Sequence, residues 1–114
     1  MLKLPSLPFP PSVNHYWVRN KNGGLRVSAE GKTYRERVMW KLNRAMRQPL
    51  QGMLAVDILV DMPDKRRRDL DNLLKALLDS LTAAGVWIDD SQIADLRIRK
   101  SDKVGGCVEV TIWR

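Results

Sequence analysis

The chain has 114 residues, with 20 Lys and Arg against 13 Asp and Glu, and a formal net charge of +7 at pH 7. This length fits one domain, 1–114, and excludes separate binding and catalytic modules. The single cysteine, Cys107, excludes an internal disulfide, and no stretch approaches the roughly 20 apolar residues of a membrane span. We therefore expect a soluble cytoplasmic protein with no membrane contact. A homodimer is also expected, because so small a domain buries little apolar surface alone.

The charges are unevenly distributed along the chain. Residues 1–50 carry ten basic and two acidic side chains, whereas residues 51–114 carry ten basic and eleven acidic ones, including every aspartate. A protein that only coats DNA gains nothing from carboxylates, because each one repels phosphate. The acidic residues are therefore either structural, in turns and at helix starts, or neutralised by a divalent cation.

The first part of the chain predicts a strand, a loop and a helix. Residues 1–8 form a weak strand that ends at the prolines of Pro8-Phe9-Pro10-Pro11. A polar loop spans 20–24, and a helix runs from Ser28, a plausible N-cap, to about Arg47. Apolar residues recur in this helix at helical spacing: Tyr34, Val38, Leu42 and Ala45. A basic stripe follows its other side: Arg37, Lys41 and Arg44.

The second part predicts a strand, a helix and two strands. Residues 54–62 alternate with the two-residue period of a strand, and a helix over about 70–84 ends at Gly85. Residues 93–100 and 107–113 are strands, and Gly105-Gly106 indicates a hairpin turn between them. The predicted fold is α/β, of α+β-like character, with order β-α-β-α-β-β and a mixed four-stranded sheet packed against two helices.

Three aspartates are candidates for a metal site. Asp69 and Asp71 stand where the loop becomes the second helix, and Asp90 follows the next apolar patch, VWIDD. Mg²⁺ prefers oxygen ligands, usually one or two carboxylates with waters and substrate phosphate oxygens. Asp90 can join the other two only if the chain returns past them. The alternative is structural: Asp69 caps the helix, and the helix dipole favours the negative charge of Asp71 in the first turn. Each effect would stabilise the helix by about 0.3–1 kcal/mol.

Basic residues adjoin these aspartates. Lys75 lies one helical turn after Asp71, where it could orient a water or neutralise charge on a phosphate, or form an ordinary i,i+4 ion pair with Asp71 or Asp79. The run Lys65, Arg66, Arg67 and Arg68 is suited to hold phosphates. The alternative is a solvated basic loop.

Three segments carry the most specific pattern of the chain: LPFPPSVNHYW at 7–17, VSAEGKTYR at 27–35 and MPDKRRRDLDNLLKALLDSLTAAGVWIDD at 62–90. Through these segments the chain resembles the RusA-type Holliday junction resolvases over nearly its whole length. The resemblance implies that Asp69, Asp71 and Asp90 are the catalytic, metal-binding residues and that Lys75 is the lysine needed for activity. Asn14 belongs to the N-terminal motif and is assigned to DNA binding with the basic run and the stripe.

The resemblance also implies a function. The expected protein is a bacterial or phage-encoded homodimer that acts in DNA recombination and repair. It cuts a four-way junction with paired symmetric nicks. Mg²⁺ is the expected cofactor, with Mn²⁺ as a substitute, and the products carry 5'-phosphate and 3'-hydroxyl ends. Two alternatives remain open at this point: a DNA-binding module without catalysis, and a nuclease that acts on flaps or forks.

Overall fold

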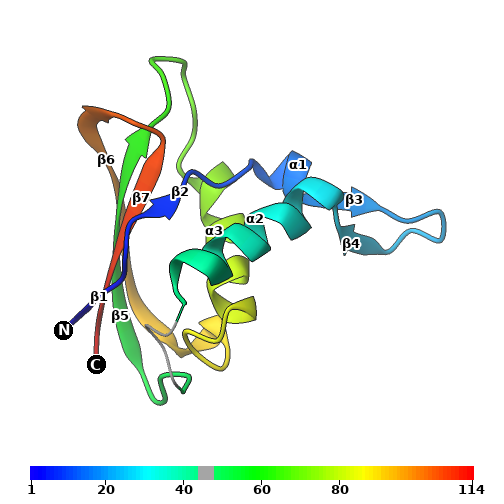
Figure 1. Ribbon diagram of the computed structural model, residues 1–114. Coiled ribbons are helices and arrows are strands. Elements are labelled where there is room, and N and C mark those ends of the chain that lie inside the picture. Colours follow the sequence, from blue (N-terminus) through cyan, green and yellow to red (C-terminus); the bar gives the residue numbers. More distant parts are fainter. Residues whose placement is uncertain (44–47) are drawn as a thin grey trace.

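Strand β5 (Leu54–Met62) is the centre of the sheet in the computed structural model, which describes residues 1–43 and 48–114. Its side chains alternate between a buried face and a half-buried face over the whole strand. The buried face packs against the helices, which cover only one side of the sheet (Figure 1). The two-residue period in the sequence thus predicted both the bounds of this strand and its inward face.

The neighbours of β5 make the sheet mixed. Strand β7 (Cys107–Trp113) pairs with β5 antiparallel, and β6 (Ile93–Val104) pairs with its other side in parallel. Two short strands, β1 (Leu2–Lys3) and β2 (Leu7–Pro8), both pair with the outer edge of β7, so the sheet has five strands and not the predicted four. The single strand predicted over 1–8 is split, and Pro5, which has no N–H to donate, lies in the break.

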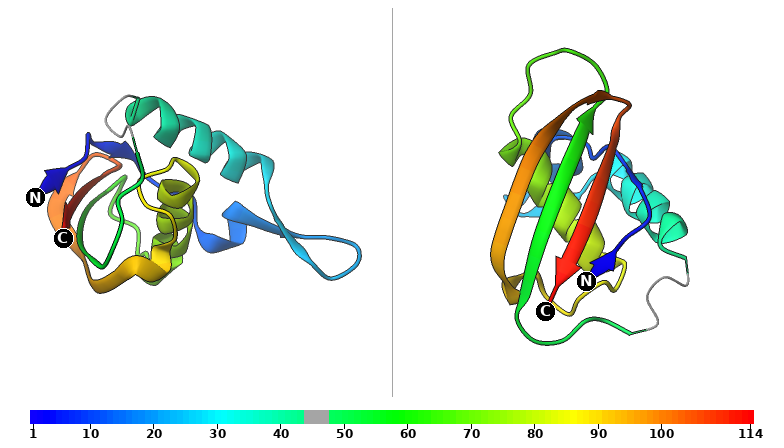
Figure 2. Two further views of the ribbon diagram at one scale, coloured as in Figure 1. Left: turned by 90° about the horizontal axis from the view of Figure 1, so that it is seen from below. Right: turned by 90° about the vertical axis from the view of Figure 1, so that its left-hand side faces the viewer.

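The predicted hairpin between the last two strands is wrong. β6 and β7 are not neighbours, because β5 lies between them (Figure 2, right). The connection passes over the end of β5, where the N–H groups of Gly105 and Gly106 donate to the Met62 carbonyl at 2.9 and 3.3 Å. Gly106 has φ +71°, a left-handed conformation that glycine adopts without steric cost. The glycine pair predicted the turn, but no local signal shows that another strand lies between the two arms.

The two long helices confirm the sequence pattern with adjusted ends. Helix α2 (Ala29–Lys41) starts after Ser28, whose Oγ accepts from the Gly31 N–H at 3.0 Å, as an N-cap does. It ends earlier than predicted, and the predicted continuation through Arg44 and Ala45 lies outside the described residues. Helix α3 (Asp71–Ala83) is followed by Gly85 at φ +83°, the left-handed position expected after a helix.

Smaller elements extend the fold beyond the prediction. A one-turn helix, α1 (Val13–Tyr16), leads into β3 (Trp17–Arg19), which pairs with β4 (Leu25–Val27) as a separate hairpin. This hairpin projects away from the body (Figure 1), and the predicted loop 20–24 is its tip. A single 3-10 turn, η1 (Asp90–Gln92), precedes β6.

The core joins one face of the sheet to α2 and α3. Inward side chains of β5 and β7 meet Tyr34 and Val38 of α2 and Leu77 and Leu81 of α3, all of which are buried. Trp87, also buried, donates its indole N–H to Thr82 Oγ1 at 2.6 Å and so ties the turn after α3 to that helix. The result is a small α+β fold with a mixed sheet, as expected. No helix within 1–43 or 48–114 is long and apolar enough to span a membrane.

Candidate active site

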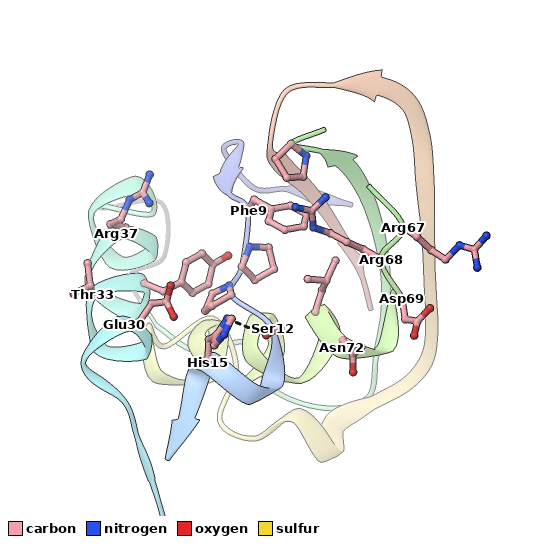
Figure 3. A pocket seen from close by; sticks show the side chains of 15 residues that line it. Phe9, Ser12, His15, Glu30, Thr33, Arg37, Arg67, Arg68, Asp69 and Asn72 are labelled. Atoms are coloured by element: carbon pink, nitrogen blue, oxygen red, sulfur yellow. Dashed lines mark hydrogen bonds between the residues drawn. The ribbon is translucent and has the colours of Figure 1, made fainter. Parts of the chain in front are cut away.

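A groove of about 680 Å³ lies between α2, the segment 9–15 and the start of α3 (Figure 3). Arg37 stands on the α2 side, and Asp69 stands on the α3 side. Between them the floor is formed partly by the proline-rich segment, including Phe9 and Pro10. The groove therefore brings Arg37 of the predicted basic stripe, two arginines of the basic loop and one predicted metal ligand to a single surface.

Asp69 and Asp71 are presented at the start of α3 without acting as caps. The N-cap position is Leu70, which has no side-chain cap, and Asp71 is the first helical residue. Leu70 also packs partly against the core, which fixes the direction in which the helix begins. The capping alternative for Asp69 is therefore wrong. Both carboxylates are exposed, and the N-terminal end of the helix dipole favours negative charge at this position.

The aspartates of the chain divide into two groups by their partners. One group accepts a side-chain hydrogen bond or ion pair within the chain: Asp57, Asp61, Asp64, Asp79 and Asp89. Among the described residues, no such partner contacts the carboxylates of Asp69, Asp71 or Asp90. Asp95 and Asp102, near the two ends of the edge strand β6, also lack a side-chain partner among the described residues. A missing partner thus leaves a carboxylate available to a cation but does not by itself identify a ligand.

Asp90 lies at the opposite end of α3 from the other two candidates. α3 has 13 residues, so a rise of about 1.5 Å per residue separates its ends by about 20 Å. The sheet shows the same separation: the backbone carbonyl of Arg68 accepts from Lys100 Nζ at 2.6 Å near the far end of β6, whereas the turn of Asp90 precedes the start of that strand. No group of three or more His, Cys, Asp or Glu in the described parts of the chain is placed to hold a metal ion together. One chain therefore brings Asp69 and Asp71 near each other but does not bring Asp90 to them.

The turn that carries Asp90 is held in place by Gln92. Its Oε1 accepts from the N–H groups of Ile88 and Asp89 at 2.8 and 3.0 Å. Its Nε2 donates to the carbonyls of Leu50 and Gly52 at 3.0 and 2.9 Å. These bonds leave Asp90 exposed on a well-defined surface turn.

Lys75 shares the exposed side of α3 with Asp71. Neither of the ion pairs considered from the sequence is present between these described residues, because Asp79 is bound by Arg35 and Asp71 has no cationic partner. The Lys75 ammonium instead lies 6.0 Å from the centroid of the Trp17 ring, at the limit of a cation–π contact. Lys75 is thus placed one helical turn from Asp71 with its charge unpaired by any described carboxylate.

The basic loop is partly organised by its own acid. Asp64 accepts from Arg68 and from the backbone N–H of Arg66, and these bonds lower the pKa of Asp64 to about 2. The Arg68 guanidinium lies 5.7 Å from the centroid of the Phe9 ring, across the groove floor (Figure 3). Arg67 also lines the groove, has no such partner among the described residues, and extends its guanidinium outward from the rim (Figure 3). The loop thus combines one fixed arginine with exposed cations.

The remaining predicted DNA-binding residues differ in whether they line this groove. Arg37 lines it, and Lys41 lines two smaller hollows that Arg37 also borders. Lys65 and Arg66 are exposed on the loop, and Asn14 is exposed on α1 but does not line the groove. Arg44 lies outside the described residues.

The sequence did not predict several residues of the groove, or the hydrogen-bond network that positions the helices. Phe9, Ser12, His15, Glu30, Thr33 and Asn72 all line the groove. Beneath it, Tyr16 Oη donates to Asp79 and accepts from Arg35 Nε at 2.7 Å, which joins α1, α2 and α3. Burial, followed by the Asp79 hydrogen bond, raises the pKa of Tyr16. The proline run predicted only the end of the first strand near Phe9, and periodicity carries no signal for a contact between residues 63 positions apart.

Gly31 permits the close approach on which this arrangement depends. A Cβ at this position would lie 2.6 Å from Val27 Cγ1 and 2.7 Å from the Tyr16 carbonyl oxygen. Only glycine lets α2 start directly against the α1–β3 junction. The SAEG segment thereby fixes one wall of the groove.

Comparison with known proteins identifies a family and relatives of this chain. The sequence signature of the family described as Endodeoxyribonuclease RusA matches residues 8–113. The crossover junction endodeoxyribonuclease RusA of Escherichia coli (strain K12) is 47% identical over 109 residues, which cover 94% of this chain and 90% of that protein. With the same coverage, the proteins of the same name from Shigella sonnei (strain Ss046) and Enterobacteria phage 82 are 46% and 45% identical.

Proposed function

The chain belongs to the RusA family of endodeoxyribonucleases, and we propose that it hydrolyses phosphodiester bonds of branched DNA as a crossover junction endodeoxyribonuclease. The observation that carries this proposal is a pair of carboxylates, Asp69 and Asp71, that have no side-chain partner among the described residues and lie beside a groove lined by Arg37, Arg67 and Arg68. A surface that only binds DNA gains no affinity from such carboxylates. The substrate is a four-way junction, cut by paired symmetric nicks that leave 5'-phosphate and 3'-hydroxyl ends.

A divalent cation fits these carboxylates. Asp69, Asp71 and Asp90 offer oxygen ligands that no described residue occupies, and such ligands suit Mg²⁺, for which Mn²⁺ substitutes. Bound there, the metal would polarise the scissile phosphate and lower the pKa of a coordinated water. The protein's own groups hold the DNA: Arg37 and Arg67 bind phosphates, and Lys75 neutralises charge that develops on the reacting phosphate.

The distance between Asp71 and Asp90 supports a dimeric site. About 20 Å of helix separates these residues in one chain, far beyond the reach of a shared metal ion. We propose that two copies associate so that Asp90 of one copy approaches Asp69 and Asp71 of the other. A twofold dimer of this kind presents two equivalent sites, which suits two symmetric cuts. Since the substrate is DNA in a bacterial or phage-infected cell, the site of action is the cytoplasm.

A junction assay tests this function. The wild-type protein is incubated with a synthetic four-way junction and with a linear duplex of equal length, with Mg²⁺ or with a chelator. We expect paired nicks in the junction only when Mg²⁺ is present, and 5'-phosphate ends on the products. Cutting of the duplex at the same rate, or cutting in the chelator, would contradict the proposal.

A further inference from the structure

Trp40 is exposed to an unusual degree for a tryptophan on a helix that packs against the core. Its side chain is 78% exposed, although Val38 and Leu42 on either side of it are buried. A large apolar ring left in water costs free energy that burial or stacking would recover. The ring is therefore available to a ligand that could cover it.

The surroundings of Trp40 are cationic. Trp40 lies in a hollow of about 290 Å³ bordered by Pro8, Arg37 and Lys41. Arg37 and Lys41 are four residues apart on one helix face, an arrangement that is unfavourable for like charges unless an anion lies between them. Neither forms a salt bridge with a described carboxylate. The hollow thus pairs an exposed ring with two cations that need a counter-charge.

This hollow is continuous with the candidate active site. Arg37 borders both the Trp40 hollow and the groove that holds Asp69. A third hollow shares Phe9 and Pro63 with that groove and shares Lys41 with the Trp40 hollow. The path from Asp69 therefore runs past Arg68 and Phe9 to Arg37 and ends at Trp40.

We propose that this path holds an unpaired DNA strand and that the Trp40 ring stacks on one of its bases while Arg37 and Lys41 bind the flanking phosphates. An indole stacks on any base, and guanidinium and ammonium groups neutralise the backbone, which is how proteins bind single strands without sequence preference. Paired bases already stack on one another, so the ring favours a strand that has separated at a branch. The identification of DNA as the ligand rests on the proposed nuclease function.

Matched variants test the stacking directly. Binding of a single-stranded thymidine oligonucleotide and of a linear duplex is measured without divalent metal for the wild type, Trp40→Ala and Trp40→Phe. Trp113→Ala serves as the control, because Trp113 is 39% exposed at the end of β7, outside the groove and both hollows. We expect Trp40→Ala to weaken single-strand binding by about fivefold to a hundredfold. Duplex binding should change little, Trp40→Phe should recover most of the loss, and Trp113→Ala should bind as the wild type does.

Three results would overturn the stacking. The first is unchanged single-strand binding by Trp40→Ala. The second is an equal loss for single strand and duplex that Trp40→Phe does not recover. The third is a loss of self-association in Trp40→Ala with DNA binding intact, which would make the ring a protein contact. Because the assay needs no cleavage, a protein that fails to cut junctions but binds single strands through Trp40 would refute the nuclease function and leave this inference standing.

Discussion

The two ends of α3 both present exposed aspartates, but their surroundings differ. Asp69 and Asp71, at the first end, adjoin the basic loop and the groove, where a phosphate can approach. Asp90, beyond the other end, lies on a turn fixed by Gln92, with no arginine or lysine bonded to it among the described residues. The first end combines carboxylates with nearby cations, whereas at the second end Asp89 accepts from Ser91 and Asp90 has no such side-chain partner among the described residues. This difference supports the proposal that each site is divided between two copies of the chain.

The largest expected effect is the loss of cleavage when either end loses its carboxylate. Asp71→Asn and Asp90→Asn should each reduce junction cleavage by at least about 100-fold, since even outer-shell partners of a metal contribute about 10–100-fold. Junction binding, measured without metal, should remain. A variant at either position that cuts at the wild-type rate would remove that residue from the site.

Mixing the two inactive variants separates a shared site from a site within one chain. If the site is shared, one of the two sites in a mixed dimer is complete. The Asp90→Asn copy supplies Asp69 and Asp71 to that site, and the Asp71→Asn copy supplies Asp90. We therefore expect equimolar Asp71→Asn and Asp90→Asn to recover cleavage of one strand, measured on a junction labelled on each strand in turn. If each chain completed its own site, the mixture would stay inactive.

A smaller effect is expected from Lys75, which supports the first end of α3 without being a ligand. Lys75→Ala should lower the cleavage rate by about 10–100-fold, because it removes a positive charge one turn from Asp71. Metal affinity, measured by Mn²⁺ titration, should change little. Lys75→Arg keeps the charge and should recover part of the rate, whereas equal losses in both variants would indicate that Lys75 acts only through its packing on Trp17.

The smallest effect concerns the second end, through the bonds of Gln92. Gln92→Ala should lower the free energy of unfolding by about 2 kcal/mol, because it removes four largely exposed hydrogen bonds, each contributing at the low end of about 0.5–1.5 kcal/mol. The Tm should fall by roughly 4–10 °C, and cleavage should fall less than in Asp90→Asn. Gln92→Glu keeps the acceptor and loses the donors, so its Tm should lie between those of the wild type and Gln92→Ala. A Tm unaffected by Gln92→Ala would show that the turn does not depend on this side chain.

Local sequence signals predicted the elements that rest on local physics. The alternation in 54–62 defined β5, Ser28 marked the start of α2, and Gly85 marked the position that follows α3. Each of these signals depends on residues that are only a few positions apart in the sequence. The same reasoning placed Asp69 and Asp71 together, because two residues of separation at a helix start cannot carry them far from each other.

Tertiary structure decided every relation between distant segments. The turn at Gly105-Gly106 was visible in the sequence, yet β5 lies between β6 and β7 because its apolar residues are buried best at the centre of the sheet. The groove between α2 and α3 depends on the Tyr16–Arg35–Asp79 network, which joins three helices. Most of all, only the fold showed that Asp90 lies a helix length from Asp71. Sequence determined which carboxylates are available, because chemistry belongs to single residues, whereas the distance between them is a property of the whole packed chain.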